Sequence, residues 1–327
     1  MNIKTLLSRI QKTSHTFDVT GLSLNTQSLQ KGDIFVAVQG TQKHGAEFVQ
    51  NAIDKGCIAI LVEDRDIQCS VPSIRINHLS SYLSDLAQTF YQEAQNIRLI
   101  GITGTNGKTS VADFFIQILN LNKMRAASIG TLGIQSQLFK KKTFLTSIDP
   151  ISLHKYLHHL AKLKINNVIV EASSHGLHQN RLDYLKLKAG IFTNLSHDHL
   201  DYHKNIKNYL NSKLYLIKNL LGKQKFCITN ENNFFYKKIK KICKKKKIKI
   251  NSIGGNKGNL KILSHKVKNN FQEVVFSYKE KKFKFKTFLI GKYQINNLLF
   301  AMLLAEKCGL SIDKSLKKIA YIKSASG

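Results

Sequence analysis

The chain has 327 residues, a formal net charge of +31 and a hydrophobic content of 43%. This length predicts about two or three domains with cores of their own. No apolar run approaches the ~20 residues of a membrane span, and the N-terminus lacks the apolar core and cleavage site of a secretion signal. The five cysteines are dispersed without a C-x-x-C pair, which indicates reduced thiols and a cytoplasmic protein.

The excess of lysine does not by itself predict a nucleic-acid-binding protein. Lysine is spread along the chain together with much Asn and Ile, while Pro and Trp are nearly absent, as in sequences shaped by AT-rich codons. The densest run, 237–249, carries apolar residues at Ile239, Ile242 and Ile248 and predicts a solvated helix face that leads into a strand. We expect no specific nucleic-acid partner, although weak, salt-sensitive binding to polyanions follows from the charge.

Residues 1–90 predict a small α/β unit. Apolar runs at 34–38 and 58–62 indicate strands, and 46–55 indicates a helix that Gly56 closes. This strand–helix–strand order is that of a βαβ unit.

Residues 91–327 predict a larger α/β unit with a mainly parallel sheet. Strands expected at 97–102, 166–171, 188–193 and 225–229 alternate with helices expected at 109–122, 151–164 and 206–221. Ligands then belong at the carboxyl ends of the strands. The period-two pattern of 260–290 predicts an antiparallel β insert, and helices are expected at 293–308 and 311–322.

A glycine-rich turn joins the expected strand 97–102 to the expected helix 109–122. It reads Thr103-Gly104-Thr105-Asn106-Gly107-Lys108-Thr109-Ser110, with Ile102 where the strict Walker pattern has glycine. Backbone N–H groups of such a loop approach phosphates closely, and the helix N-terminus adds positive potential. We expect Lys108 to reach the β- and γ-phosphates and the Thr109 hydroxyl to ligate Mg²⁺. The strand–loop–helix context favours this reading over a glycine turn without nucleotide.

Two further blocks, 170–181 and 192–203, follow expected strands. With the loop and Thr146-Ser147-Ile148-Asp149-Pro150, they resemble the Mur ligase family, the ATP-dependent amide-forming enzymes of peptidoglycan synthesis. The resemblance runs through the whole chain in order, including 24–27 and 32–37. The block Ser173-Ser174-His175-Gly176-Leu177 favours the branch that adds the third amino acid to UDP-N-acetylmuramoyl-L-alanyl-D-glutamate.

The resemblance implies a UDP-muramoyl-peptide-binding domain at 1–90 and a P-loop ATPase-like, ATP-binding domain at 91–327. It also implies that the C-terminal amino-acid-binding domain of related ligases is absent from this sequence. We therefore expect the chain alone to bind its substrates without completing the ligation. The implied partners are the UDP-N-acetylmuramoyl dipeptide and a free amino acid, meso-diaminopimelate in preference to L-lysine. A monomer is expected.

The resemblance also assigns site residues. Lys108, Glu171, His199 and Lys213 are implied to be catalytic, and Thr109, Glu171, His199 and Lys213 are implied metal ligands. The implied nucleotide-binding residues are Gly104, Thr105, Asn106, Gly107, Lys108, Thr109 and Ser110. The implied substrate contacts are Leu24, Thr26, Thr41, Gln42, Lys43, Thr146, Ser147, Ser173, Gln179 and Arg181.

Elementary chemistry agrees with several of these assignments. Glu171 ends an apolar strand, where its carboxylate can hold Mg²⁺ together with Thr109. Lys213 matches the lysine that is carbamylated in the family; addition of carbon dioxide turns its amine into an anionic oxygen ligand. Arg181 offers a planar cation that suits a pyrophosphate or a carboxylate. The simpler alternatives are a capping or core histidine at 199 and a surface lysine at 213.

Three other functions compete with this one. His197-x-His199-x-Asp201 resembles the opening of a dinuclear zinc motif, but Tyr202 stands where that motif needs histidine. A folate polyglutamate ligase shares the phosphate loop, yet it lacks a UDP-binding domain before the loop. A non-catalytic nucleic-acid-binding protein would be retained on DNA at physiological salt, with or without Lys108.

Overall fold

The computed structural model describes residues 1–40, 42–92, 97–143, 145–254 and 258–325. The chain divides into a smaller unit, Met1–Gln95 with Asp149–His159, and a larger unit, Asn96–Ile148 with Leu160–Gly327. The segment Asp149–His159, which the sequence places with the larger unit, thus groups with the smaller one. Within the described ranges, no helix is both long and apolar enough to cross a membrane.

The smaller unit is built on a parallel four-stranded sheet in the order β1-β2-β3-β4. Its strands are β1 (Gly21–Ser23), β2 (Asp33–Ala37), β3 (Ala59–Glu63) and β4 (Ser73–Ile76). Its helices are α1 (Ile3–Leu7), α2 (Val49–Asp54) and α3 (Leu79–Phe90), with a 3₁₀ turn η1 (Gly45–Phe48). Every residue of β2 and β3 is buried, as expected for parallel strands covered on both faces.

The prediction of strands at 34–38 and 58–62 is confirmed, and β1 and β4 were not predicted. The helix expected over 46–55 is in fact η1 followed by α2. A capping box explains this start, because the His44 side chain accepts from the Ala46 N–H while Glu47 accepts from the His44 N–H.

The larger unit has an eleven-stranded sheet in the order β15-β14-β13-β12-β11-β10-β5-β9-β6-β7-β8. Its strands are β5 (Arg98–Thr103), β6 (Ala126–Gly130), β7 (Gly133–Ser136), β8 (Lys140–Lys141), β9 (Asn167–Glu171), β10 (Leu187–Phe192), β11 (Leu221–Asn230), β12 (Lys249–Gly254), β13 (Leu260–Val267), β14 (Gln272–Tyr278) and β15 (Lys281–Thr287). The predicted mainly parallel sheet and the antiparallel insert at β13–β15 are confirmed. The antiparallel strands β7 and β8 at the other edge were not predicted.

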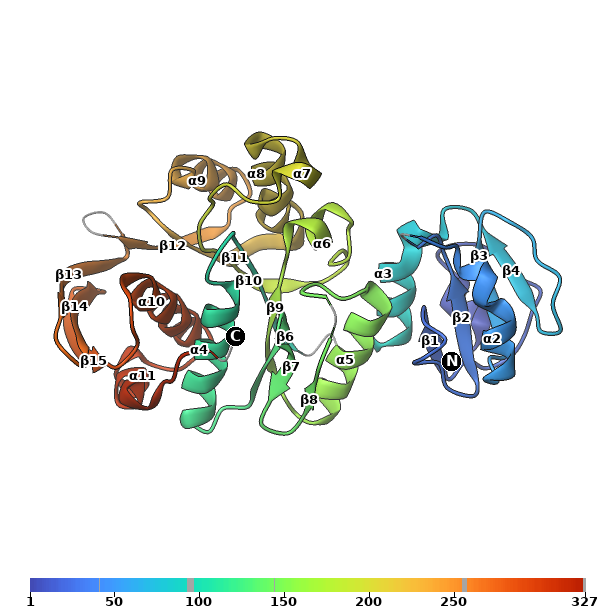
Figure 1. Ribbon diagram of the computed structural model, residues 1–327, viewed down its shortest axis with the longest axis horizontal. Helices are drawn as coiled ribbons and strands as arrows, with labels where there is room; N and C mark the ends of the chain where they lie inside the picture. The colour runs from blue at the N-terminus through green and yellow to red at the C-terminus, as the bar shows by residue number, and fades with distance from the viewer. Residues whose placement is uncertain (41, 93–96, 144, 255–257, 326–327) are drawn as a thin grey trace. The chain divides into compact units, whose positions relative to one another are not determined.

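The helices of the larger unit are α4 (Lys108–Leu121), α6 (Ser174–His178), α7 (Leu200–His203), α8 (Ile206–Tyr215), α9 (Tyr236–Lys245), α10 (Lys292–Lys307) and α11 (Ile312–Leu316). Helix α5 (Pro150–Lys162) begins in the segment that groups with the smaller unit. Helices α4 and α10 lie side by side on one face of the large sheet (Figure 1), and their buried side chains form one core with those of the strands. The helix predicted at 206–221 ends at Tyr215 and continues as one π-helical turn, η3 (Leu216–Leu220). The helix predicted at 311–322 is α11 plus a 3₁₀ turn, η4 (Ile319–Tyr321).

Strand order places β5 between β9 and β10, with Ile102 beside Glu171 and Thr103 beside Phe192. The chain segments that follow these three parallel strands therefore emerge at one edge of the sheet. This is the position at which open α/β sheets bind their ligands.

Candidate active site

The loop after β5 can be built only with glycine at two positions. Gly104 has φ +147°, and a Cβ there would overlap the Thr193 hydroxyl. Gly107 has φ +84°, and a Cβ there would lie 2.5 Å from the Asn297 Oδ1 atom. Both conformations are ones that L side chains rarely adopt.

The segment after β10 fixes the tip of this loop. The Asn106 N–H donates to Asn194 Oδ1 at 2.9 Å, and the Asn194 amide donates back to the Asn106 carbonyl at 3.0 Å. The Thr193 hydroxyl donates to the same carbonyl at 2.7 Å. Sequence reasoning did not single out Thr193 or Asn194, although their position directly after a strand adjacent to β5 is a usable signal.

Helix α4 begins at the loop with Gly107 as its N-cap residue, and no side chain caps it. Its first N–H groups therefore keep their capacity to bind an anion. A pocket of about 260 Å³ lies at this end of the helix. The pocket is lined by Thr105, Asn106, Gly107, Lys108, Thr109, Ser110, Thr131, Thr146, Ser173 and His199. The structure thus brings most of the predicted loop residues together with three predicted residues from elsewhere.

Lys108 folds back over its own loop. Its Nζ donates to the carbonyls of Gly104 at 3.0 Å and Thr105 at 2.9 Å. Burial lowers the pKa of its ammonium group, an effect that the negative charges of Glu171 and Asp198 oppose.

Glu171, at the end of β9, is 2% exposed, and its carboxylate accepts hydrogen bonds from two threonines. Its Oε2 accepts from the Thr109 hydroxyl at 3.1 Å and the Thr131 hydroxyl at 3.0 Å, and its Oε1 accepts from the Thr131 N–H at 3.2 Å. Burial raises the pKa of this carboxyl, while Thr131 and Lys108 lower it. A Cβ at Gly130, the last residue of β6, would overlap the carboxylate, so glycine at this position leaves room for Glu171.

This arrangement fits a Mg²⁺ ion held by few protein groups. Magnesium prefers hard oxygen ligands and keeps most of its waters. The adjacent Thr109 hydroxyl and Glu171 carboxylate supply two such oxygens beside the anion-binding end of α4. Among the residues that the structure describes, no group of three or more His, Cys, Asp or Glu side chains is arranged to hold a metal ion. The dinuclear zinc alternative needs such a group.

Lys213, on α8, is 1% exposed and lies behind the loop. Its Nζ donates to the Gly104 carbonyl at 2.8 Å and lies 4.4 Å from the centre of the Tyr209 ring. Burial first, and the charge of Lys108 second, lower the pKa of Lys213 to about 7. The alternative of an ordinary surface lysine is therefore wrong for this residue.

His199 is exposed and lines the pocket, with its Nε2 3.5 Å from an oxygen of Asp198. Its ring centre is 5.0 Å from that of His175 and 6.2 Å from that of Tyr209. His175 and His203 lie close together, and burial lowers the pKa of both rings, that of His203 to about 4.

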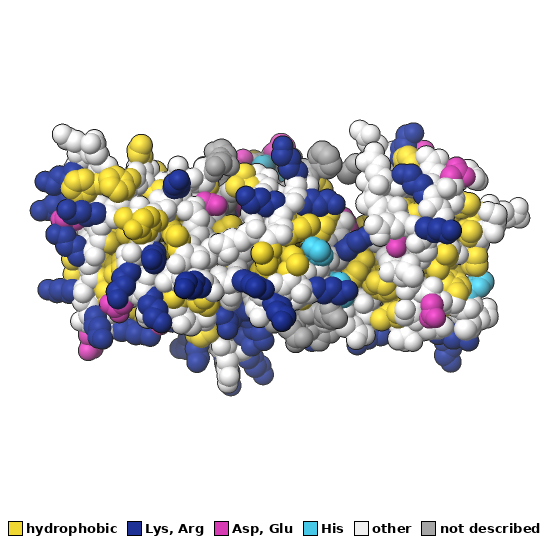
Figure 2. All heavy atoms as spheres, turned by 90° about the horizontal axis from the view of Figure 1, so that it is seen from below, with side chains coloured by type: hydrophobic (Ala, Val, Ile, Leu, Met, Phe, Trp, Pro, Cys, Tyr) yellow, Lys and Arg dark blue, Asp and Glu magenta, His cyan; other side chains and the backbone are white. Residues whose placement is uncertain are grey.

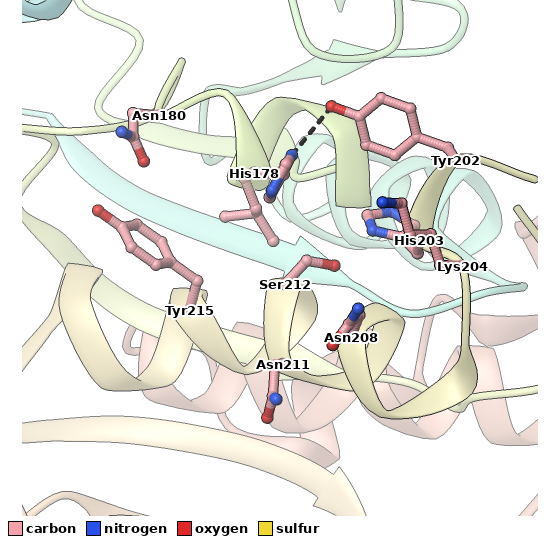
Figure 3. Close-up of a pocket in the computed structure, with 10 residues that line it drawn as sticks. His178, Asn180, Tyr202, His203, Lys204, Asn208, Asn211, Ser212 and Tyr215 are labelled. Atoms are coloured by element: carbon pink, nitrogen blue, oxygen red, sulfur yellow. Dashed lines mark hydrogen bonds between the residues drawn. The ribbon is translucent and has the colours of Figure 1, made fainter. Parts of the chain in front are cut away.

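A second pocket, of about 570 Å³, is bordered by α6, α7 and α8. Figure 3 shows His178 bonded to Tyr202 on one side of it, with Asn208, Asn211 and Tyr215 on the other. None of the predicted site residues lines this pocket.

Three of the predicted substrate contacts form one network. The Ser147 hydroxyl donates to the Glu171 carbonyl at 2.9 Å and accepts from the Ser173 N–H at 2.9 Å. Arg181 donates to the Ser147 carbonyl at 2.7 Å. Thr146 lies 3.1 Å from Thr131, hydroxyl to hydroxyl. Gln179 is exposed and donates to the Tyr202 hydroxyl at 3.4 Å.

The predicted contacts in the smaller unit have the following positions. Leu24 packs against that unit's core, and the Thr26 carbonyl accepts from Lys55 Nζ at 2.8 Å. Gln42 and Lys43 are exposed, with Lys43 3.8 Å from Glu47. Thr41 lies outside the described residues.

Comparisons with known proteins agree with this geometry. A family model described as the Mur ligase middle domain matches residues 102–305, and one described as the Mur ligase family, catalytic domain, matches residues 18–91. The chain is 32% identical over 314 residues to the UDP-N-acetylmuramoyl-L-alanyl-D-glutamate–2,6-diaminopimelate ligase of Rickettsia rickettsii, covering 95% of this chain and 65% of that protein. The ligase of the same name from Chelativorans sp. (strain BNC1) is 34% identical over 310 residues, covering 94% of this chain and 64% of that protein.

A solved structure of a ligase with this name has the same fold. It superposes with a TM-score of 0.85 at 23% identity, covering 100% of this chain and 68% of that one. The chain spans about 65% of the length of the relatives that it matches in sequence.

Proposed function

The chain belongs to the Mur ligase family, and from this premise we propose that it acts in the ATP-dependent addition of meso-diaminopimelate to UDP-N-acetylmuramoyl-L-alanyl-D-glutamate, in the cytoplasm and as a monomer. The observation that carries the proposal is the buried Glu171 carboxylate, bonded to Thr109 at the anion-binding end of α4. Relatives named for this reaction match nearly the whole chain, which supports the choice of substrate and amino acid. L-lysine is the alternative amino acid.

In this proposal the loop holds the nucleotide. The free N–H groups of α4 and the Lys108 ammonium bind the phosphates, and Lys108 exchanges its carbonyl partners at Gly104 and Thr105 for them. Thr109 and Glu171 hold Mg²⁺, and Thr131 orients the carboxylate. When bound, ATP supplies the phosphoryl group that makes an acyl phosphate of the substrate carboxylate, and Mg²⁺ neutralises the phosphate charge.

His199 and Lys213 complete the proposed metal-binding set. His199 lines the same pocket as Thr109, and Lys213 bonds the Gly104 carbonyl of the loop. A lysine ammonium repels a cation, so Lys213 can serve only after carbamylation, in which its neutral amine adds to carbon dioxide and releases a proton. Burial and the lowered pKa of Lys213 favour the neutral amine that this step needs.

The remaining predicted residues are the proposed contacts of the UDP-sugar peptide. Arg181 and Ser173 are the proposed contacts of an anionic group of the peptide, and their bonds to Ser147, next to Glu171, support this choice. Leu24, Thr26, Thr41, Gln42 and Lys43 are the proposed contacts of the UDP end.

Calorimetric titration tests this substrate choice against a folate polyglutamate ligase. UDP-N-acetylmuramoyl-L-alanyl-D-glutamate should bind the chain, and a folyl glutamate should not. Arg181→Ala should weaken binding of the UDP-peptide by about 10- to 100-fold, since it removes a charge-assisted contact. Arg125→Ala, at an exposed arginine that bonds the Leu163 carbonyl, is the control and should bind like the unaltered chain. Tighter binding of the folate, or equal affinities for both arginine variants, would contradict the proposal.

A further inference from the structure

Helix α9 presents a dense row of lysines to solvent. Its apolar face, Ile239 and Cys243, is buried. The exposed lysines of this helix are Lys237, Lys238, Lys240, Lys241, Lys244 and Lys245, which together with Phe234 are called the α9 face below. Figure 1 shows α9 at the periphery of the larger unit, and it contacts η3 and β12. The helix is thus held in the fold by its apolar side, and its charged side faces outward.

These lysines have no acidic partners in the part of the chain that the structure describes. No ion pair between described residues includes them, whereas Lys279 pairs with Glu306 and Lys284 with Glu273. Glu231 is the sole acidic residue in the sequence between Tyr202 and Gln272. On the face shown in Figure 2, by contrast, acidic side chains lie among the lysines and arginines. Lysines three and four positions apart on one helix repel each other and destabilise it. An anionic surface would offset this repulsion.

A large aromatic side chain stands at the start of this helix. Phe234 is 90% exposed, and its ring makes an edge-to-face contact with Phe235 at 5.1 Å between ring centres. An exposed aromatic ring beside a cluster of lysines is the combination that suits a lipid headgroup interface, where the ring enters the boundary region and the lysines face anionic headgroups.

We propose that the α9 face docks the protein on an anionic lipid surface. The composition of this region favours lipid over nucleic acid. The sequence contains no arginine after Arg181, and arginine is the residue whose planar fork binds phosphates and base edges bidentately in nucleic acids. Lysine is a hydrated point charge, which suits a diffuse layer of lipid headgroups. The proposal is independent of the ligase activity, because no residue of the α9 face lines the pocket at the start of α4.

Vesicle co-sedimentation at low salt tests the proposal with the full chain. Vesicles that contain phosphatidylglycerol should bind the protein, and vesicles of phosphatidylcholine alone should not. The triple variant Lys237→Gln, Lys241→Gln, Lys244→Gln should lose about 100-fold in affinity, at about fivefold for each lysine. Its matched control, Lys261→Gln, Lys281→Gln, Lys282→Gln, removes the same charge from exposed positions on β13 and β15 and should bind within about threefold of the unaltered chain.

Substitutions of Phe234 distinguish a lipid surface from a nucleic acid as the partner of the α9 face. Phe234→Leu keeps an apolar side chain and should retain vesicle binding, whereas Phe234→Ser should weaken it. Equal binding of the two triple variants, or binding that does not distinguish the two vesicle types, would overturn the proposal. Tighter binding to a single-stranded oligonucleotide than to vesicles at equal phosphate concentration, lost in Phe234→Leu, would assign the face to nucleic acid instead. An unchanged far-ultraviolet circular dichroism spectrum and thermal midpoint show that each variant is folded.

Discussion

Lys213 illustrates how strongly one side chain depends on its surroundings. Its ammonium group shares the Gly104 carbonyl with Lys108, and no carboxylate among the described residues lies within ion-pair distance of it. A buried lysine near another cation is disfavoured in its charged form, and the pKa of about 7 expresses this. The neutral form is the nucleophile that carbon dioxide requires.

Carbamylation of Lys213 should therefore be detectable in the folded chain. After equilibration with ¹³C-bicarbonate, the NMR spectrum should contain a carbamate resonance that Lys213→Arg removes. Its intensity should rise as the pH increases through about 7, because the free amine becomes the major form. Lys188→Arg, at an exposed lysine of β10, should leave the resonance unchanged. A spectrum that is identical for the unaltered chain and Lys213→Arg would contradict the expectation.

The loop pattern itself indicated Lys108 and Thr109, whereas Glu171 was implied by the family resemblance, with which its position at the end of an apolar strand agrees. The sequence did not indicate Thr131. Hydroxyl residues are common, and the role of this one arises from the close turn after β6 that brings its N–H and hydroxyl to Glu171. Such a role depends on three-dimensional placement and has no local sequence signal.

Among the secondary-structure elements, η3 packs against the sheet at two glycines. The Leu216 side chain packs over β5 and β10, where Gly101 and Gly190 leave room for it. The sequence predicts one helix over 206–221. In the structure the helix ends at Tyr215, the π-helical turn follows, and β11 begins directly at Leu221.

Gly190→Ala should destabilise the fold. Its Cβ would lie 2.6 Å from a methyl carbon of Leu216 and 2.7 Å from one of Leu221, both in a packed core. Overpacking of this kind costs about 1–3 kcal/mol in the free energy of unfolding. Gly222→Ala is the control, since its nearest atom would be Lys225 Cγ at 3.9 Å, and it should change stability by less than about 0.5 kcal/mol. Urea denaturation measures both, and equal midpoints for the two variants would refute this account of η3.

At the scale of the whole molecule, the sequence established the α/β class, the central parallel sheet and the antiparallel insert. These features follow from apolar runs and periodicity, which are local. The grouping of Asp149–His159 with the smaller unit could not be predicted in this way, because it depends on long-range packing such as that of Ile151 in that unit's core.

His154, in the same segment, gives the molecule a pH-dependent stability. It is 4% exposed, neither ring nitrogen has a hydrogen-bond partner among the described residues, and burial lowers its pKa to about 4. An unfolded histidine titrates near 6.5, so between these values the unfolded chain binds more protons. The stability that the buried, neutral His154 contributes is fully present above pH ~6.5. It is lost as the pH falls from there toward 4, because the unfolded chain takes up a proton that the folded chain does not.

The free energy of unfolding should therefore be lower at pH 4.5 than at pH 7, as measured by urea denaturation at both pH values. His154→Leu should reduce this difference by up to roughly 3 kcal/mol, because the side chain no longer takes up a proton on unfolding. His78→Asn, at an exposed histidine with φ 53°, keeps a residue suited to that backbone and should leave the difference unchanged. An equal pH dependence for the unaltered chain and His154→Leu would refute the assignment.

The central claim is that the loop between β5 and α4 binds a nucleotide through Lys108. Calorimetric titration with a non-hydrolysable ATP analogue in the presence of Mg²⁺ tests it most directly. Lys108→Ala should bind the analogue about 10- to 100-fold more weakly than the unaltered chain, because it removes a cation from the phosphates. Lys281→Ala, at an exposed lysine of β15, should bind it equally well. If Lys108→Ala and the unaltered chain bind the analogue with the same affinity, or if neither binds it, the account of this site is wrong.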